Sequence, residues 1–295
     1  MAQQKIYLRK VRDFGENLGD TFQFIRQELK PLLKSFFFIS GIFMLGAAVI
    51  SGIYQMEVFS VFDDIGKKPS ENIGVAGIFG SIFTPTYFLI ILLFVLGMVA
   101  MNVTVASYLK VYDQQETSPT LEEVWIEFKR YFFRALIISL LISLLIVIGL
   151  ILCILPGIYL AVVFTPVVYI MVNEDASIGE AFSRCFSLVK ENFWISLGIY
   201  FVAYLIYSFA AGIIGVVFGI FIGISSYLTT KELESTMAIV NSVTNIFSYM
   251  FYVVFAVAVG LHYYNLAEKL DGIGMMRRLD TLGSVDPNAK IEEQY

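Results

Sequence analysis

Charged side chains are scarce in this chain of 295 residues and are missing altogether from its longest apolar run. Asp, Glu, Lys and Arg make up 15% of the residues, whereas soluble domains carry about 25%. No Asp, Glu, Lys, Arg or His occurs in the 38 residues from 135 to 172. Because one bilayer span needs about 20 apolar residues, this run is long enough for two spans. We therefore expect an integral membrane protein.

Residues that bind metals are nearly absent as well. The chain has one histidine, His262, and two cysteines, Cys153 and Cys185. Metal and haem sites need several imidazoles, thiolates or clustered carboxylates, so the sequence predicts no metal and no cofactor. The cysteines are expected to be small, buried apolar residues rather than a pair. His262, which precedes two tyrosines, is expected to be an anchoring or hydrogen-bonded residue rather than a ligand.

The sequence also lacks the patterns of the common enzymes and pumps. It has no nucleophile elbow, no Ser/His/Asp set and no glycine-rich phosphate loop, so we expect no catalytic residues and no enzymatic activity. The expected spans contain no Asp, Glu, Lys or Arg, which argues against coupled transport. The mild net charge of −5 gives no sign of a nucleic-acid partner.

Apolar residues, at 58%, define the predicted architecture. The expected fold is all-α: a polytopic helical bundle with about six transmembrane helices and amphipathic helices at the cytoplasmic interface. The transmembrane domain is expected to occupy 1–270. A tail at 271–295 has a short amphipathic stretch near 275–282 and is expected to lose order after Ser284. The predicted spans lie near 35–56, 84–109, 135–154, 157–173, 193–216 and 237–265.

Three local features qualify these spans. Pro156 lacks an amide and Gly157 tolerates turn geometry, so the third and fourth spans are predicted to form a hairpin that turns at these two residues. The long uncharged segment 192–230 could hold one long span or two short helices. We expect one span, with 215–227 as its continuation or a bent segment. Residues 73–83 are expected to form an interfacial segment on the outer face.

Lys and Arg predict the orientation. Seventeen of them lie before the first span, between spans two and three, between spans four and five, or after the sixth span. The opposite side has three: Lys67, Lys68 and Lys231. Because cytoplasmic loops carry the excess of positive residues, both termini are predicted to be cytoplasmic.

Each predicted hairpin follows a segment with helix-start signals. Thr120 with Glu123, and Ser177 with Glu180, match the capping box, in which a hydroxyl and a glutamate satisfy free amides at a helix start. Asp20 is expected to cap a third such helix. Apolar residues follow at helical spacing, with charges on the other face. These patterns predict three units, each an interfacial helix followed by a two-span hairpin.

The segment from Pro156 to Trp194 resembles the bacterial glycerophosphoryl diester phosphodiesterase membrane-domain family. The resemblance covers about 118–200, and Cys185 stands where serine is usual. It implies a membrane module without the catalytic domain that some family members carry, and a connection with lipid or envelope homeostasis. The positions that match the family pattern are Pro156, Gly157, Ile158, Tyr159, Pro166, Glu174, Ala181, Ser183, Arg184, Leu188, Lys190, Phe193 and Trp194.

Three further groups of residues are candidate sites, each with two interpretations. A basic rim could bind lipid headgroups or only anchor the chain at anionic lipid; it comprises Arg130, Arg134, Arg184 and Lys190. A small-residue ridge could pack helices within the chain or form an oligomer or partner interface; it comprises Ala211, Gly215, Gly219 and Gly223. A polar intramembrane face could bridge helices or line a headgroup cavity; it comprises Asn241, Asn245 and Ser248.

The function expected from these features is that of a non-catalytic, lipid-associated module in the bacterial cytoplasmic (inner) membrane. It would handle or sense phospholipid, through a lateral groove near Arg184 and Asn241. One alternative is a structural or accessory subunit that binds a membrane protein partner or forms a homo-oligomer. The other is an uncoupled transporter of a lipid or apolar solute.

Overall fold

A computed structural model describes residues 5–67, 79–80, 82–229 and 233–276 of the chain. About 90% of the structure is helical, and no strand occurs in the described part. Six helices are long and apolar enough to cross a membrane. The predicted all-α bundle with six potential spans is therefore confirmed. The predictions for 73–78, for residues beyond 276, and for Lys68 and Lys231 fall on residues outside the described ranges.

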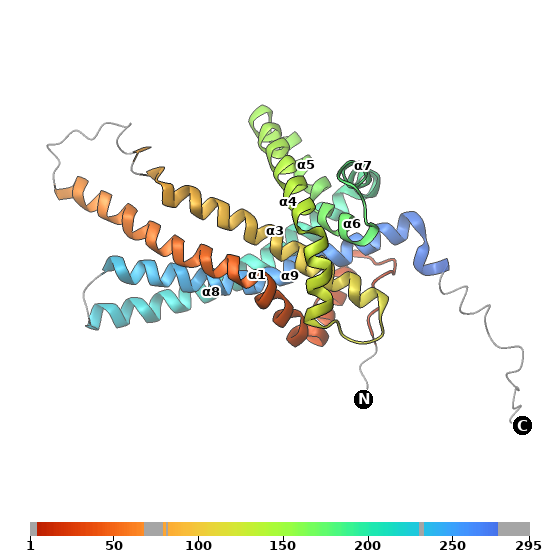
Figure 1. Cartoon of the computed structure of the whole chain (residues 1–295), viewed down its shortest axis with the longest axis horizontal. Helices are drawn as coiled ribbons and strands as arrows, with labels where there is room; N and C mark the ends of the chain where they lie inside the picture. The colour runs from red at the N-terminus through yellow and green to blue at the C-terminus, as the bar shows by residue number, and fades with distance from the viewer. Residues whose placement is uncertain (1–4, 68–78, 81, 230–232, 277–295) are drawn as a thin grey trace, which may run out of the picture.

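Long helices form the body of the molecule, and short helices lie between some of them along the chain (Figure 1). The α1, α3, α8 and α9 helices run to one side of the molecule, whereas the α4–α5 hairpin diverges from them (Figure 1). We call the end that holds the start of α1 and the end of α9 the terminal end, and the opposite end the distal end (Figure 1). The elements are α1 (Phe14–Lys67), α3 (Pro85–Gln114), α4 (Leu121–Leu152), α5 (Ile154–Phe164), α6 (Val167–Glu174), α7 (Ile178–Val189), η1 (Lys190–Asn192), α8 (Phe193–Thr229) and α9 (Leu233–Asp271).

Helix starts follow the predicted capping signals in two of three cases. The capping boxes at Thr120 and Ser177 are both present, at the starts of α4 and α7. The predicted cap at Asp20 is wrong. Helix α1 starts earlier, where Asp13 and Glu16 exchange backbone-to-carboxylate hydrogen bonds of 2.7 and 3.1 Å. Asp20 lies inside α1 and accepts a hydrogen bond from Arg12 instead.

The predicted interfacial helices are only partly separate elements. Helix α1 continues without a break from the N-terminal segment through its apolar stretch, with Pro31 inside it. Helix α4 likewise joins its capped amphipathic start to its apolar part. Only α7 is a helix of its own, and the short η1 turn connects it to α8. A separate helix therefore precedes a hairpin in one unit rather than in three.

The α4–α5 hairpin forms, but its turn is not at Pro156 and Gly157. Cys153 interrupts the helix with extended backbone (φ −168°, ψ 144°) and ends α4, and α5 begins at the next residue. Pro156 lies in the first turn of α5. Backbone amides in the first turn of a helix have no acceptor within the helix, so the missing N–H of proline costs no hydrogen bond there. Cys153 is exposed at this turn, contrary to the expected buried position, whereas Cys185 is buried as expected.

Gly157 is required for the close approach of α4 and α5. A Cβ atom at this position would lie 2.3 Å from Leu150 Cδ2 and 2.8 Å from the Leu150 backbone nitrogen. We expect Gly157→Ala to lower the free energy of unfolding by about 1–2 kcal/mol, measured by thermal unfolding in nanodiscs. Gly179→Ala is the control, because no atom lies within 4 Å of the added Cβ. Equal melting temperatures for the two variants would contradict this packing.

The predicted fourth span is broken, and segment 192–230 holds one long helix. The fourth potential span is not one continuous helix, since α5 ends at Phe164 and α6 begins at Val167, after Thr165 and Pro166. Proline cannot continue the helical hydrogen bonds, which explains this break. By contrast, α8 runs unbroken from Phe193 to Thr229, so segment 192–230 does not contain two short helices.

The packed core lies at the terminal end. The buried residues of α3 run from Gly97 to Tyr112 and thus belong to its second half. Away from this core large apolar side chains are exposed: only 11% of the most apolar stretch of α8 is buried, and 22% of that of the diverging α4. In water such surfaces would be costly, whereas in a bilayer they meet hydrocarbon.

Candidate functional site

The basic rim lies at the terminal end, on α4, α7 and η1, around the short loop between α6 and α7. Arg130 Nη2 lies 2.6 Å from Asp175 Oδ2, and Arg134 Nη1 lies 3.7 Å from Asp175 Oδ1. The Tyr131 hydroxyl donates to the same carboxylate at 2.9 Å. Asp175 ends α6 in the left-handed conformation, with φ of 51°. This loop therefore connects to α4 through one acidic side chain.

Arg184 forms the second part of the rim. Its Nε atom lies 3.0 Å from Glu174 Oε2, and its Nη2 atom pairs with Asp271 at the end of α9. The Tyr263 hydroxyl also donates to Glu174, at 3.1 Å. The structure thus places three of the four predicted rim residues around neighbouring acids. Lys190 is exposed in η1, and no ion pair joins it to these acids in the described part of the chain.

The hollow beside the rim is a poor site for an anion. It measures about 610 Å³ and is lined by two carboxylates, those of Asp175 and Glu180, as well as by Arg134. The start of α7 is already occupied by its own capping box, in which Glu180 accepts from the Ser177 amide at 2.8 Å. This backbone bond, together with the Ser177 hydroxyl, lowers the pKa of Glu180 below its ordinary value. A phosphate here would meet two negative side chains.

Asp175→Asn removes the negative charge between the rim arginines and leaves the backbone conformation of the loop unchanged. Asparagine tolerates the left-handed conformation but loses the ion pairs with Arg130 and Arg134. Since these side chains are about half exposed, we expect a loss of only about 0.5–1 kcal/mol, measured by thermal unfolding. The loss should shrink as salt is raised. A salt-independent loss would show that the carboxylate acts in another way.

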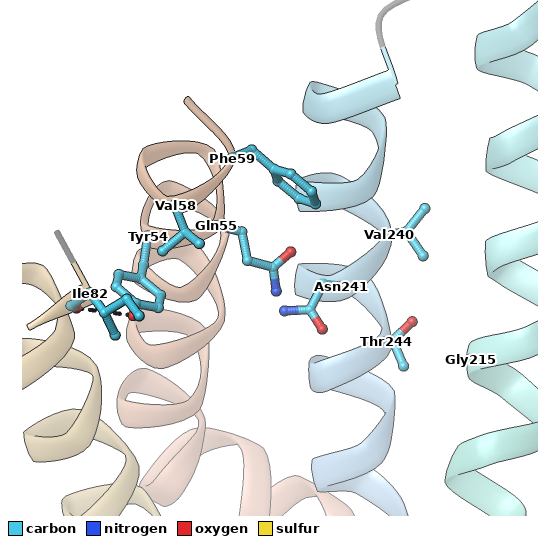
Figure 2. Close-up of a pocket in the computed structure, with 9 residues that line it drawn as sticks. All are labelled: Tyr54, Gln55, Val58, Phe59, Ile82, Gly215, Val240, Asn241 and Thr244. Carbon is cyan, nitrogen blue, oxygen red and sulfur yellow. Dashed lines mark hydrogen bonds between the residues drawn. The ribbon is translucent and has the colours of Figure 1, made fainter. Parts of the chain in front are cut away.

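A second candidate site lies at the distal end, where four helical segments meet. It is a cavity of about 660 Å³, which is within the usual range for small-molecule pockets. Helices α1 and α9 supply most of its lining, α8 supplies Gly215, and Ile82 comes from just before α3 (Figure 2). We call it the distal cavity. Its lining residues are Tyr54, Gln55, Val58, Phe59, Ile82, Gly215, Val240, Asn241 and Thr244.

Uncharged polar groups are concentrated where α1 meets α9. The amide ends of Gln55 and Asn241 point toward one another (Figure 2). Asn241 Nδ2 donates to Ser51 Oγ at 3.2 Å. The next residue, Ser242, donates to the carbonyl of Ala48, one helical turn before Ser51, at 2.9 Å. The Tyr54 hydroxyl donates to the Ile82 carbonyl at 3.1 Å and so joins α1 to the start of α3. These bonds hold the wall of the cavity.

The predicted polar face reaches this cavity only in part. Asn241 lines it, whereas Ser248 donates to the Thr244 carbonyl of its own helix at 2.8 Å. Asn245 is half-buried and does not belong to the lining. Sequence reasoning missed Tyr54, Gln55 and Thr244. A signal was available for Gln55, an amide in the last turn of the predicted span 35–56.

The small-residue ridge packs on α9 over part of its length. A Cβ atom on Gly215 would lie 3.0 Å from Thr244 Cγ2, and one on Gly219 would lie 3.8 Å from Val240 Cγ1. Gly223 has no atom within 4 Å of such a position, and Ala211 is half-buried. The inner ridge residues thus serve packing within the chain.

The predicted groove near both Arg184 and Asn241 is wrong. Arg184 pairs with Asp271 at the C-terminal end of α9, whereas Asn241 lies near its start. Thirty helical residues separate Asn241 from Asp271, or about 45 Å at 1.5 Å per residue. The rim and the distal cavity are therefore two separate places at opposite ends of the bundle.

His262 is inside the protein. It is fully buried, and its Nε2 atom lies 2.8 Å from the hydroxyl of Ser196 on α8. The Ser196 hydroxyl is also 2.9 Å from the Asn192 carbonyl. His262 is thus a hydrogen-bonded residue that joins α9 to α8. Among the described residues, no group of three or more His, Cys, Asp and Glu side chains could hold a metal ion.

Comparison with known proteins adds no relative. No protein-family model matches the chain, and neither the curated proteins nor the solved structures gave a match.

Proposed function

We propose that this chain is a lipid-associated membrane module that binds the polar part of a lipid in the distal cavity. The observation that carries the proposal is the pair of facing amides, Gln55 and Asn241, in a cavity whose other walls are largely apolar. Such a lining suits an amphiphile, since amides hold the polar group while apolar residues contact the remainder. The exposed apolar surfaces beside the cavity would place it in contact with lipid chains.

The proposal includes an orientation. The excess of Lys and Arg at the terminal end favours a cytoplasmic location for both termini, in a bacterial inner membrane. The distal cavity would then face the outer leaflet. Gln55 and Asn241 lie in the end turns of the predicted spans 35–56 and 237–265, where headgroups are found. We also propose that segment 156–194 is related to the glycerophosphodiesterase membrane-domain family, and such a relationship would support a role with lipid.

Native mass spectrometry tests the binding. The full chain would be extracted with its membrane lipid and compared with Asn241→Leu, which removes one of the two amides. We expect wild type to retain a defined lipid and the variant to lose most of it. Ser143→Leu is the matched control, because Ser143 is exposed on α4 and bonds only to its own helix. Equal retention by all three proteins would contradict a site at the distal cavity.

A structural or accessory subunit is the second candidate, favoured by the exposed distal surface of α8. Val216, Ile220 and Phe221 are each about 60–70% exposed there. Gly219→Leu would disturb packing on Val240 within the chain, so Gly223→Leu is the better probe of a partner interface. Loss of a stoichiometric co-purifying protein in Gly223→Leu would support this alternative. An unchanged complex, or no complex, would count against it.

A further inference from the structure

We infer that the distal cavity takes an uncharged, hydroxyl-bearing headgroup, such as the sugar of a neutral glycolipid, rather than a phosphate. This inference rests on the proposed function and specifies the lipid class for the same site. It follows from the charge, the hydrogen-bonding groups and the aromatic rings of the lining.

Charge is the first argument. None of the nine lining residues is Asp, Glu, Lys, Arg or His. The acidic side chain closest along α1 is that of Glu57, which turns toward α3 and accepts from the hydroxyls of Thr84 at 3.4 Å and Thr86 at 3.0 Å. A phosphate in the cavity would therefore lose water without gaining a cation from the nine lining residues, and it would lie on the same helix turn as a carboxylate. Burying a charge without a partner is costly, so this lining disfavours anionic and zwitterionic phospholipids.

The hydrogen-bonding groups give the second argument. A carboxamide offers two N–H donors and one carbonyl acceptor. Asn241 directs one N–H at Ser51, which leaves it a donor and an acceptor, and Gln55 adds a second amide. The Thr244 hydroxyl oxygen is buried and has no hydrogen-bond partner among the described residues. Hydroxyl groups both donate and accept, so they can pair with this mixed set. Phosphate oxygens only accept and would face the amide carbonyls unfavourably.

The lining also contains aromatic rings, which suit a sugar. Both aromatic residues of the lining come from α1: Tyr54 leans toward Ile82, and Phe59 leans toward α9 (Figure 2). The bond from the Tyr54 hydroxyl to the Ile82 carbonyl holds that ring in place, and the ring also contacts Tyr87 with centroids 5.8 Å apart. The C–H faces of a sugar ring are apolar and pack on aromatic side chains, while its hydroxyls reach the amides beyond. A sugar headgroup would thus contact both the aromatic rings and the amides of the lining.

The test uses the full chain in nanodiscs that contain equal amounts of three lipids with the same dioleoyl chains. These are monoglucosyl diacylglycerol, phosphatidylglycerol and phosphatidylethanolamine, and the retained lipid is measured by native mass spectrometry. We expect the glucolipid to be enriched about tenfold over phosphatidylglycerol. Gln55→Leu should abolish the enrichment, and Ser143→Leu should preserve it. Asn241→Lys, which adds a cation to the cavity, should shift retention toward phosphatidylglycerol.

The outcomes separate the two proposals. Retention of all three lipids without preference, or a preference for a phospholipid in wild type, overturns the inference about the headgroup and leaves a lipid site in place. Retention of no lipid by wild type overturns the proposed function as well. Unchanged preference in both Gln55→Leu and Asn241→Lys would show that the distal cavity does not select the headgroup.

Discussion

Replacing Arg12 with leucine is expected to destabilise the protein by about 3–5 kcal/mol, because it leaves buried polar groups without partners. The Arg12 side chain is fully buried. Its guanidinium donates to the carbonyls of Tyr7, Leu8 and Lys10 at 2.5, 2.6 and 3.1 Å, and to Asp20 at 2.8 Å. Leucine can make none of these bonds. The effect would appear as a large drop in the melting temperature in nanodiscs.

The Arg12 backbone belongs to the same arrangement. Asn265 of α9 accepts from its amide at 2.9 Å and donates to its carbonyl at 3.1 Å, so the N-terminal segment is held against the end of α9. Arg12→Lys should recover little stability, because an ammonium lacks the planar fork that reaches several carbonyls at once. Arg26→Leu, an exposed arginine on α1, is the control and should change stability by no more than about 0.5 kcal/mol. Similar losses at positions 12 and 26 would contradict the role of burial.

Gly260→Leu is expected to lower stability by about 3 kcal/mol or more, since α9 packs on α3 and α6 at this point without room for a side chain. Even a Cβ atom would lie 2.3 Å from Leu109 Cδ1 and 2.9 Å from Tyr169 Cε1. Leu109 could move, but Tyr169 is fully buried and its hydroxyl donates to the Ala256 carbonyl at 2.6 Å. The added side chain would therefore separate the helices.

Gly212→Leu is the matched control for this change. No atom lies within 4 Å of a Cβ at Gly212, on α8, so its leucine should be accepted. Removing a glycine from a helix interior should even raise stability slightly. Thermal unfolding of both variants under the same conditions measures the difference. A melting temperature for Gly260→Leu equal to that of Gly212→Leu would show that α9 does not pack as described.

The sequence was a good guide to most features that one chain segment determines. Uncharged runs predicted six potential spans, and the hydroxyl–glutamate pairs at Thr120 and Ser177 predicted two helix starts. The hairpin turn was misplaced because proline and glycine are typical of turns, yet proline is equally acceptable in the first turn of a helix. The chain turns three residues before Pro156, at Cys153, which has no turn signature of its own.

The sites were harder to predict because they depend on which helix faces meet. Arg130 and Arg134 were expected to face lipid, but Asp175, some 40 residues later, lies beside both. The distal cavity combines residues from α1, α8 and α9 with Ile82, and no spacing within one segment reveals such a meeting. Of the lining residues, the sequence predicted only Asn241 and Gly215, although Gln55, an amide at the end of an apolar run, gave a signal as well.

Photo-crosslinking at the distal cavity tests the central claim most directly. p-Benzoylphenylalanine in place of Val240, which lines the cavity, is compared with the same residue in place of Ile213, which is 63% exposed on α8. After irradiation in native membranes, mass spectrometry identifies the adducts. A lipid site at the cavity predicts one dominant lipid adduct at position 240 and a mixture reflecting bulk lipid at position 213. The same bulk mixture at both positions, or protein adducts alone at 240, would contradict it.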